Sequence, residues 1–443
     1  MFNRQNITSF ILFSAIIIAY GYFSLFNSIF LSVLILIAYV SYHKYNSKDE
    51  YGKVIQVSLK AVFAASIIAF TAFTYKSYGP RDWDFTCFYL YGNVAANGMD
   101  FYNPEDYYSI LKTLHIPIEL NAGFYREVID VGCPYPPPTL LLFSILGFFD
   151  YDNALIIWTL LNIVFLIGSI ALVRNIFFSS RGIESVMISV ALVLTFHSTL
   201  TTIFYSQILF ILLFFLLLFY KYRSKPWSGG FLAIAIFLKP FTAILLLYLI
   251  LARQKKAVLF FIISCLAICL VTGLMFGFRP FIEYIINNPN NRAPELLFTE
   301  FNNQSLLAEL FRNLPGNKFA AKVLYYLISV FVVFFFGSIL YQKRNNTDLY
   351  GVYFVVLLAI ALLLYPSGQY NYPLVHLVSM LILLNYLKRL DNAALFIFLF
   401  YLVSYAGLFY LNLFLLLACV LLINKDRVGF IYFEIRNFLK SGT

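Results

Sequence analysis

Long apolar runs alternate with short polar stretches along the chain, and most of these stretches carry a cluster of lysine and arginine. A helix needs about 20 apolar residues to cross a lipid bilayer, and basic clusters between such runs are typical of cytoplasmic loops. The clusters are Lys44, Lys48 and Lys53; Arg174 and Arg181; Lys221, Arg223 and Lys225; Arg253, Lys255 and Lys256; Lys343 and Arg344; Lys388 and Arg389; and Lys425 and Arg427. The pattern predicts an all-α polytopic membrane protein.

If every basic cluster is cytoplasmic, the segments between clusters must cross the membrane in pairs, which gives roughly twelve spans with both termini in the cytoplasm. The predicted segments are 7–24, 27–42, 54–75, 153–173, 183–200, 207–221, 257–275, 319–341, 349–365, 372–387 and a final hairpin, 393–423, broken near Gly407. We divide the chain into an N-terminal hairpin with its cytoplasmic loop (1–53), a central core (54–318) and C-terminal transmembrane helices (319–443).

Two apolar segments do not fit a straight span. Segment 139–149 is too short to cross a bilayer, which favours a re-entrant or interfacial helix. Segment 229–252 lies between two basic clusters and has Lys239 and Pro240 at its middle. A straight helix would put the second cluster outside, whereas a hairpin of two half-helices, broken at the proline, keeps both clusters inside. We therefore predict broken helices in the core.

The two longest polar segments, 76–136 and 277–318, are predicted to be external loops. The first contains four basic and eight acidic residues, the reverse of the cytoplasmic loops. It begins just after segment 54–75 and carries Asp82 and Asp84 close to the membrane. Carboxylates at that depth are costly and often functional, so Asp84 is a candidate acid/base group. Alternatively, Asp84 caps the helix that follows it.

Composition supports a membrane protein, because 61% of the residues are hydrophobic and only 12% are charged, against about 25% charged in soluble domains. The apolar run 7–24 is followed by no small-residue cleavage site, so we expect a retained first helix. The net charge of +10 is spread over many small clusters. That distribution argues against nucleic acid as a partner.

Lys239 is the polar residue that stands out, since apolar residues surround it on both sides. A buried lysine needs an anionic partner, either a carboxylate of the protein or a phosphate of a ligand. Other polar residues are expected at or just below the outer face, where they could line a site in the membrane. These candidate substrate-binding residues are Arg81, Arg126, Tyr135, Gln207, Asn303, Ser305, Gln369 and Tyr370.

The sequence contains no recognisable cofactor or metal motif. Its four histidines are scattered without the spacing of zinc ligands, and no phosphate-binding loop is present. We therefore expect a site without a metal or a cofactor. Gly229 and Gly230 are expected to permit close helix contact. Cys87 and Cys133 both lie in the first external loop, where a disulfide between them is an option in an oxidising compartment.

Several motifs, in order, resemble those of the GT-C glycosyltransferases, and within them glycosyltransferase family 87, the polyprenyl-phosphate-dependent mannosyl- and arabinofuranosyltransferases. Together they cover about residues 54–320. The motifs are WDFTCFYLYGNVAANGMDFYNP from Trp83, YPPPTLLLF from Tyr135, Trp158 to Asn162, Ser206-Gln207, Gly230 to Lys239-Pro240, and Asn303-Gln304-Ser305-Leu306. The chain departs from the family at PSGQYNYP, 366–373, where actinobacterial members carry a histidine motif.

The resemblance implies a GT-C-type bundle with a large first external loop and an inverting hexosyltransferase reaction, with mannose as the expected sugar. The donor would be a polyprenyl-monophosphate sugar, and the acceptor a glycan or glycolipid at the external face of a bacterial inner or plasma membrane. Asp84 would be the catalytic base, assisted by Asp82, while Lys239, with Arg81 or Arg126, would bind the phosphate of the membrane lipid donor.

Two other classes of protein share some of these features. Broken helices and a lysine within the membrane also occur in transporters, for instance a lipid-linked glycan flippase. A glycan polymerase or ligase would also have large external loops. Transporters distribute charge through the depth of the membrane, whereas this chain concentrates its acidic residues in one loop. That concentration favours the glycosyltransferase.

Overall fold

The computed structural model describes residues 83–116, 129–130, 132–178, 182–286, 303–366, 372–387 and 390–424, together with Lys60, Phe63, Ala64 and Ile67. The predicted N-terminal hairpin lies outside the described residues, as does almost all of segment 54–75. So do five predicted site residues, namely Arg81, Asp82, Arg126, Gln369 and Tyr370.

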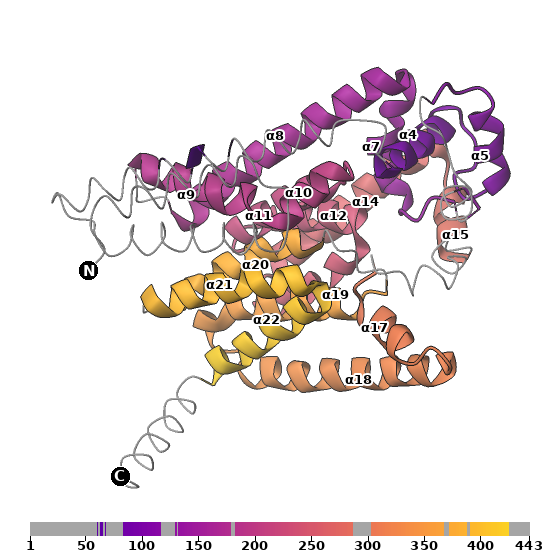
Figure 1. The fold of residues 1–443 in the computed structure, drawn as a ribbon. Coiled ribbons are helices and arrows are strands. Elements are labelled where there is room, and N and C mark those ends of the chain that lie inside the picture. The colour runs from indigo at the N-terminus through magenta and orange to yellow at the C-terminus, as the bar shows by residue number, and fades with distance from the viewer. Residues whose placement is uncertain are drawn as a thin grey trace, which may run out of the picture.

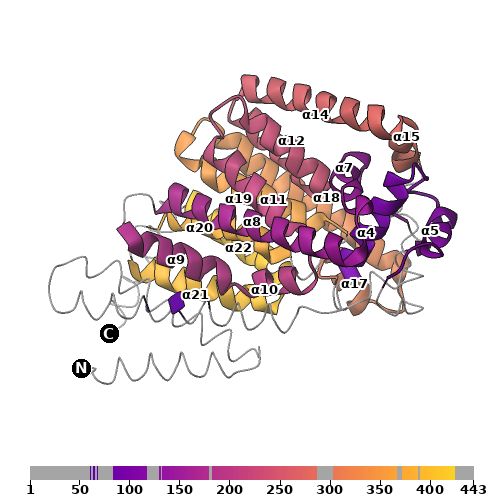
Figure 2. The same cartoon turned by 90° about the horizontal axis from the view of Figure 1, so that it is seen from above.

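The described part of the chain is built from helices (Figures 1 and 2). The first half contains α4 (Trp83–Ala96), α5 (Pro104–Leu111), η2 (Pro137–Thr139), α7 (Leu140–Ser144), η3 (Leu146–Phe148), α8 (Tyr151–Phe177), α9 (Gly182–Leu194), α10 (His197–Phe204), α11 (Leu209–Lys221), α12 (Ser228–Leu238), η4 (Pro240–Ile244) and α13 (Leu245–Leu251). The second half contains α14 (Lys255–Phe276), α15 (Arg279–Ile286), α17 (Leu306–Asn313), α18 (Lys318–Gln342), η6 (Thr347–Leu349), α19 (Tyr350–Leu364), η7 (Tyr372–Val375), α20 (His376–Leu384), α21 (Leu390–Ala406) and α22 (Leu408–Ile423).

Four helices in the described residues are long and apolar enough to cross a membrane, namely α8, α14, α18 and η6 continued by α19. A bent pair, α9 and α10, would make a fifth. The expected twelve spans are therefore not all seen as long helices. Several predicted spans are shorter in the structure, such as α11 with 13 residues in place of segment 207–221.

Segment 183–200, predicted as one span, is bent in the structure, because α9 and α10 meet at an angle of 59°; the pair is either a broken span or a re-entrant loop. Near this bend, the hydroxyl of Thr195 donates to the carbonyl of Ala191, and that of Thr199 donates to the carbonyl of Val193. Hydroxyls bonded back to the helix backbone often bend helices, which gives a physical reason for the break. The predicted break near Gly407 is confirmed, since Gly407 has a φ of 130° between α21 and α22.

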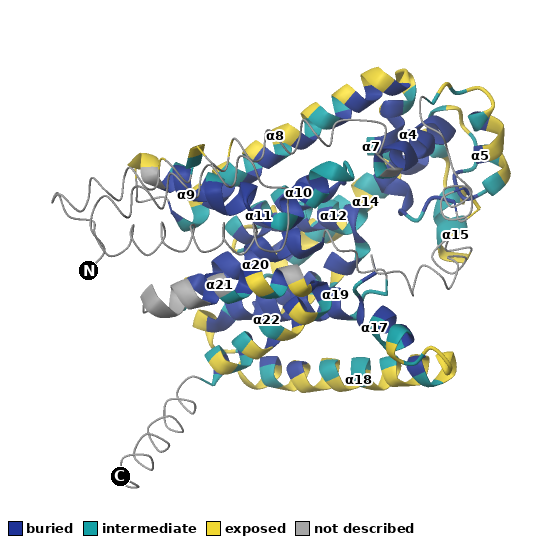
Figure 3. Ribbon diagram, in the orientation of Figure 1, coloured by how far each residue is buried: buried dark blue, intermediate teal, exposed yellow. Residues whose placement is uncertain are grey.

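The centre of the bundle is α19, whose residues from Gly351 to Leu363 are all buried. A helix that is apolar on every side is expected in the interior, and α19 packs against α13, α20 and α22. By contrast, α8, α14 and α18 expose large apolar side chains along one side, as Figure 3 shows for α8 and α18. In a membrane protein such faces contact lipid.

Both views of the fold show α4, α5, α7 and α15 together at one end of the molecule (Figures 1 and 2). The crossing of α4 with the α7–η3 segment is unusually close. A Cβ atom added to Gly92 would lie 2.1 Å from the carbonyl oxygen of Phe143, and one added to Gly147 would lie 2.6 Å from the carbonyl oxygen of Gly92. These glycines let the first loop pack directly on segment 139–149, which is broken into short helical turns.

The segment that runs from α12 to the start of α14 begins and ends at the same end of the bundle. Gly229, at the start of α12, packs on Ala257 and Phe261, near the start of α14, and a Cβ on Gly229 would lie 2.1 Å from the Ala257 carbonyl oxygen. The expectation that Gly229 permits close helix contact is thus confirmed. Between these points Lys239 is extended, with φ −148° and ψ 107°, and separates α12 from η4. Lys239 therefore lies at the turn of this segment, away from the end where the segment begins and ends.

Candidate active site

Asp84 lies in the first turn of α4 and is half-buried. Its carboxylate accepts a hydrogen bond from the side-chain amide of Gln207, which is 123 positions away in sequence and lies between α10 and α11. Gln207 is buried, and its Oε1 has no hydrogen-bond partner among the described residues. Thus the amide nitrogen of Gln207 orients the carboxylate, and its oxygen remains available as a hydrogen-bond acceptor.

Burial raises the pKa of Asp84 from 3.8 to about 6. The hydrogen bond from Gln207 and the positive charge of Lys239 both act in the opposite direction and limit the rise. The carboxyl is therefore a stronger base than an exposed aspartate, yet it is mostly ionised at neutral pH. This is the range in which a carboxylate accepts a proton effectively.

The turn that presents Gln207 is fixed by its neighbours. Ser206 has a φ of 50°, in the left-handed region where glycine is unstrained, and its carbonyl accepts a 2.7 Å hydrogen bond from the indole nitrogen of Trp158. Trp158 is fully buried. Trp158 thus holds the turn that presents Gln207 to Asp84.

Lys239 lies close enough to Asp84 for its charge to lower the pKa of that carboxyl. Only 7% of Lys239 is exposed, and its ammonium donates a 3.1 Å hydrogen bond to the hydroxyl of Tyr135. The ammonium also lies 4.7 Å from the ring centre of Tyr135 and 5.2 Å from that of Tyr372. Among the described residues no carboxylate lies within 4 Å of it. The charge is thus held by aromatic rings and a hydroxyl.

Tyr372 also contacts the candidate site, although it is not among the residues predicted from the sequence. It belongs to η7 and follows directly on the external motif that drew attention to Gln369 and Tyr370. Its ring lies 5.5 Å from Phe241, which in turn lies 5.5 Å from Tyr365. The sequence does offer a signal for it, because a tyrosine followed by a proline stands at each end of that motif. The rings of Phe241 and Tyr372 therefore lie beside the break after Lys239.

Two further bonds fix the surroundings of Tyr135. The hydroxyl of Tyr102 donates a 3.0 Å hydrogen bond to the Tyr135 carbonyl, and the hydroxyl of Thr139 donates to the carbonyl of Phe237 in α12. The first loop and the tip of the 229–252 segment are therefore joined. Burial raises the pKa of Tyr135 above its ordinary value, so the phenol keeps its proton beside the lysine.

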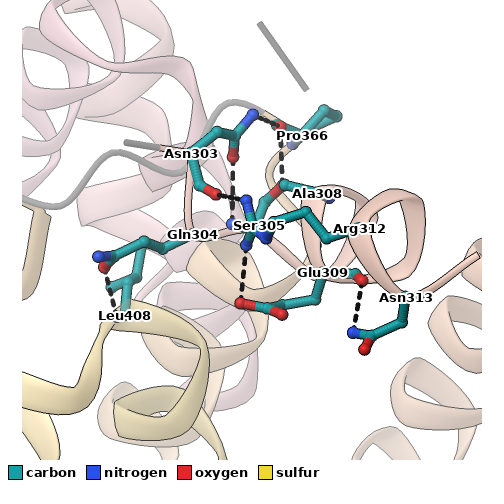
Figure 4. Close-up of polar contacts among 9 residues, drawn as sticks. All are labelled: Asn303, Gln304, Ser305, Ala308, Glu309, Arg312, Asn313, Pro366 and Leu408. Carbon is teal, nitrogen blue, oxygen red and sulfur yellow. Dashed lines mark hydrogen bonds and ion pairs between the residues drawn. The ribbon is translucent and has the colours of Figure 1, made fainter. Parts of the chain in front are cut away.

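Asn303 and Ser305 form a separate polar cluster (Figure 4). The Asn303 amide and the Ser305 hydroxyl each donate a 2.9 Å hydrogen bond to the Pro366 carbonyl, and Ser305 also caps α17. Gln304 accepts a 2.7 Å bond from the backbone of Leu408. Both Asn303 and Ser305 are buried, so these contacts support a role in holding Pro366 in place.

Within the described ranges, no group of three or more His, Cys, Asp or Glu side chains is arranged to hold a metal ion. The absence of a metal from the reaction stays a prediction, because Asp82 is not described. Cys87 and Cys133 are both buried and free, so the disulfide considered from the sequence is not formed in this structure.

The membrane-length helices define a membrane protein, and its bundle carries a carboxylate and a buried ammonium in one candidate site. The sequence model of glycosyltransferase family 87 matches residues 134–366, more than half of the chain, so the chain belongs to this family. No curated protein matches the chain, and no solved structure does. Family membership makes the protein a membrane glycosyltransferase and confirms the resemblance. The matched range includes Tyr135, Gln207 and Lys239, while Asp84 precedes it.

Proposed function

We propose that this glycosyltransferase transfers a hexose, with mannose as the first candidate, from a polyprenyl-monophosphate sugar to a hydroxyl of a glycan or glycolipid, with inversion. The observation that carries the proposal is the pairing of Asp84 with Lys239 in one site. A carboxylate of raised pKa suits the acceptor hydroxyl, and a buried cation suits the phosphate.

Asp84 would act as the general base. In an inverting transfer the acceptor oxygen attacks the anomeric carbon as the bond to the phosphate oxygen breaks, and the acceptor proton must go to a base. The Asp84 carboxylate would take that proton, while the hydrogen bond from Gln207 holds it in place. The free Oε1 of Gln207 would accept a hydrogen bond from a sugar hydroxyl. Asp82 would share in this task.

Lys239 would bind the phosphate, which gains negative charge as the sugar departs. An ammonium surrounded by aromatic rings, with a neutral hydroxyl as its nearest partner, keeps most of its charge for a ligand. The hydroxyl of Tyr135 would then form a hydrogen bond with the same phosphate. Arg81 or Arg126 would add a second cation. The aromatic rings at this position also suit one face of a sugar.

We further propose that this site faces the external side of a bacterial inner membrane, where lipid-linked sugars and envelope glycans meet. The basic loops support that orientation, since they would all be cytoplasmic. In this arrangement the chain 54–318 is the catalytic core, and residues 319–443 support it. The reaction would need no metal or cofactor, because a monophosphate donor can be neutralised by lysine and arginine alone.

The role of Asp84 is tested with purified protein in lipid vesicles and a panel of polyprenyl-phosphate hexoses and pentoses, followed by release of polyprenyl phosphate. Asp84→Asn is expected to lower kcat by at least about 100-fold, since an amide cannot accept the proton, while donor binding remains. Its unfolding temperature should not fall, because a buried charge is removed. Full activity of this variant would exclude Asp84 as the base. A wild-type protein that turned over no donor in the panel would contradict the proposed reaction.

The role of Lys239 is tested by donor affinity. Lys239→Met keeps the length of the side chain and removes its charge, so we expect at least a tenfold weaker Kd for the lipid donor and an unchanged KM for the acceptor. Lys239→Arg should restore part of the affinity. Lys322→Met is the matched control, because Lys322 is exposed on α18 away from the site. Unchanged donor affinity in folded Lys239→Met would leave Lys239 a structural role only.

A further inference from the structure

The short helix α15 has a surface that the proposed reaction does not explain. It follows α14 after Gly277, which has a φ of 79° and so turns the chain in a way that favours glycine. None of its residues is buried. Ile282, Ile285 and Ile286 are 57%, 78% and 71% exposed. A soluble surface rarely presents three such side chains together, so this face needs a partner.

The exposed apolar residues lie on one side of the helix. Phe278, Ile282 and Ile285 recur at intervals of four and three positions, and Ile286 follows Ile282 by four, which places Ile286 at the edge of the same face. Arg279 and Glu283 form an ion pair of 3.4 Å and lie beside this face, next to Ile286. An eight-residue helix with one apolar and one charged side is the pattern of a helix lying in a membrane interface.

The apolar stripe continues the lipid-facing surface of α14. Leu270, Leu274 and Met275 are exposed on the last turns of that span, and the ring of Phe278 packs back on Gly273. The lipid-facing side of the span thus passes through Phe278 into the stripe of α15 without interruption. This continuity identifies lipid as the partner. Both α14 and α15 also contact η2, so the stripe lies at the end of the bundle that carries the candidate site.

The charged side of α15 holds the first loop. Arg279 lies 3.7 Å from the carboxylate of Asp100, and the ring of Tyr284 lies 5.9 Å from that of Tyr102. Tyr102 in turn bonds to the carbonyl of Tyr135, the residue that contacts Lys239. A helix fixed at the membrane surface on one side would therefore fix the loop on the other. Asp84 belongs to that loop.

We propose that α15 is an interfacial anchor whose stripe, Phe278, Ile282, Ile285 and Ile286, inserts among lipid acyl chains at the site-bearing face of the membrane, and thereby holds the first loop at that level. The inference concerns the membrane lipids around the protein and does not depend on the identity of the donor or the acceptor.

The test compares the two sides of α15 with spin labels. Cys265 and Cys269 are first replaced by serine, because the other three cysteines are buried. Single labels are then placed with Ile285→Cys or Ile286→Cys on the apolar side and with Glu283→Cys on the polar side. Each protein is reconstituted in nanodiscs of phosphatidylethanolamine and phosphatidylglycerol. Collision rates are measured with oxygen, which concentrates in lipid, and with a water-soluble nickel chelate.

Labels at 285 and 286 are expected to collide several-fold more with oxygen than with the chelate, and the label at 283 should show the reverse preference. Equal access to the chelate on both sides would mean that the stripe faces water. Protection of 285 and 286 from both reagents would mean that protein covers it, either another part of this chain or a second copy. Either result would overturn the anchor. Glycosyl transfer does not enter the measurement, so its outcome is independent of the proposed reaction.

Discussion

If Asp84 is the catalytic base, its hydrogen bond with Gln207 helps to set the pH range in which the protein works. Burial alone would raise the pKa of Asp84 further, and the amide of Gln207 opposes that rise. If the ionised carboxylate is the base, kcat/KM must increase with pH while Asp84 loses its proton and then level off. The free protein should therefore show a midpoint near pH 6.

Gln207→Leu tests this assignment, since it removes the hydrogen bond and keeps a side chain of similar size. Without the bond the ionised form is less favoured, so the midpoint of the pH profile should move to higher pH, by roughly one unit. The measurement is kcat/KM between pH 5 and 9 for both proteins. A midpoint that stays in place, or a rate that falls as the pH rises through 6, would show that Asp84 does not limit the profile.

The sequence alone predicts some of the residues of the candidate site. Asp84, Gln207 and Lys239 stood out because polar residues beside apolar runs are costly, and the structure brings all three together. The engagement of Asn303 and Ser305 with Pro366 could not be foreseen, because it depends on two loops meeting in space. Hydrogen-bond partners that are 61 to 123 positions apart leave no local pattern.

At the scale of elements, the glycine crossing between α4 and α7–η3 should control where Asp84 lies. Gly92→Ala would place a methyl group 2.1 Å from the carbonyl oxygen of Phe143, an overlap that only a shift of backbone can relieve. We expect a loss of more than about 2 kcal/mol in stability and a drop in kcat, since α4 carries Asp84. The unfolding temperature in detergent and the initial rate measure the two effects.

Gly337→Ala is the control for Gly92→Ala. Gly337 is also helical, in α18, but a Cβ added there meets no atom within 4 Å. This control should be as stable as the parent protein or slightly more so, because alanine favours helix over glycine by about 1 kcal/mol. If Gly92→Ala unfolded at the same temperature as Gly337→Ala, the close crossing would not be needed.

Periodicity and length located most helices, but breaks were predicted only where a strong local signal existed. Pro240 and Gly407 gave such signals, and both breaks are present. The bend between α9 and α10 has neither proline nor glycine, and threonine hydroxyls bonded to backbone carbonyls lie beside it. Similarly, the sequence predicts a loop over 277–318, which includes Arg279 to Ile286, because an eight-residue helix is too short to give a clear periodic pattern.

At the scale of the whole molecule, the path of the chain through the membrane follows from which ends of its segments meet. The contact between Gly229 and Ala257 places the basic clusters 221–225 and 253–256 at one end of the bundle. Lys239, between them, contacts Tyr135 at the other end, where the first loop packs. A chain that crossed the membrane once between the clusters could not satisfy both contacts.

This topology predicts which positions a membrane-impermeant thiol reagent can reach in intact cells that express the protein. Single cysteines are introduced as Ser224→Cys, Lys256→Cys and Glu105→Cys, all exposed in the structure, after Cys265 and Cys269 are replaced by serine. If the end that carries the basic clusters is cytoplasmic, positions 224 and 256 should both react only after the cells are permeabilised. Position 105 lies in the first loop and should react without permeabilisation. Reaction of 224 and 256 from opposite sides would show that segment 229–252 is a single span, and Lys239 would then lie at mid-membrane, away from the phosphate of a lipid donor.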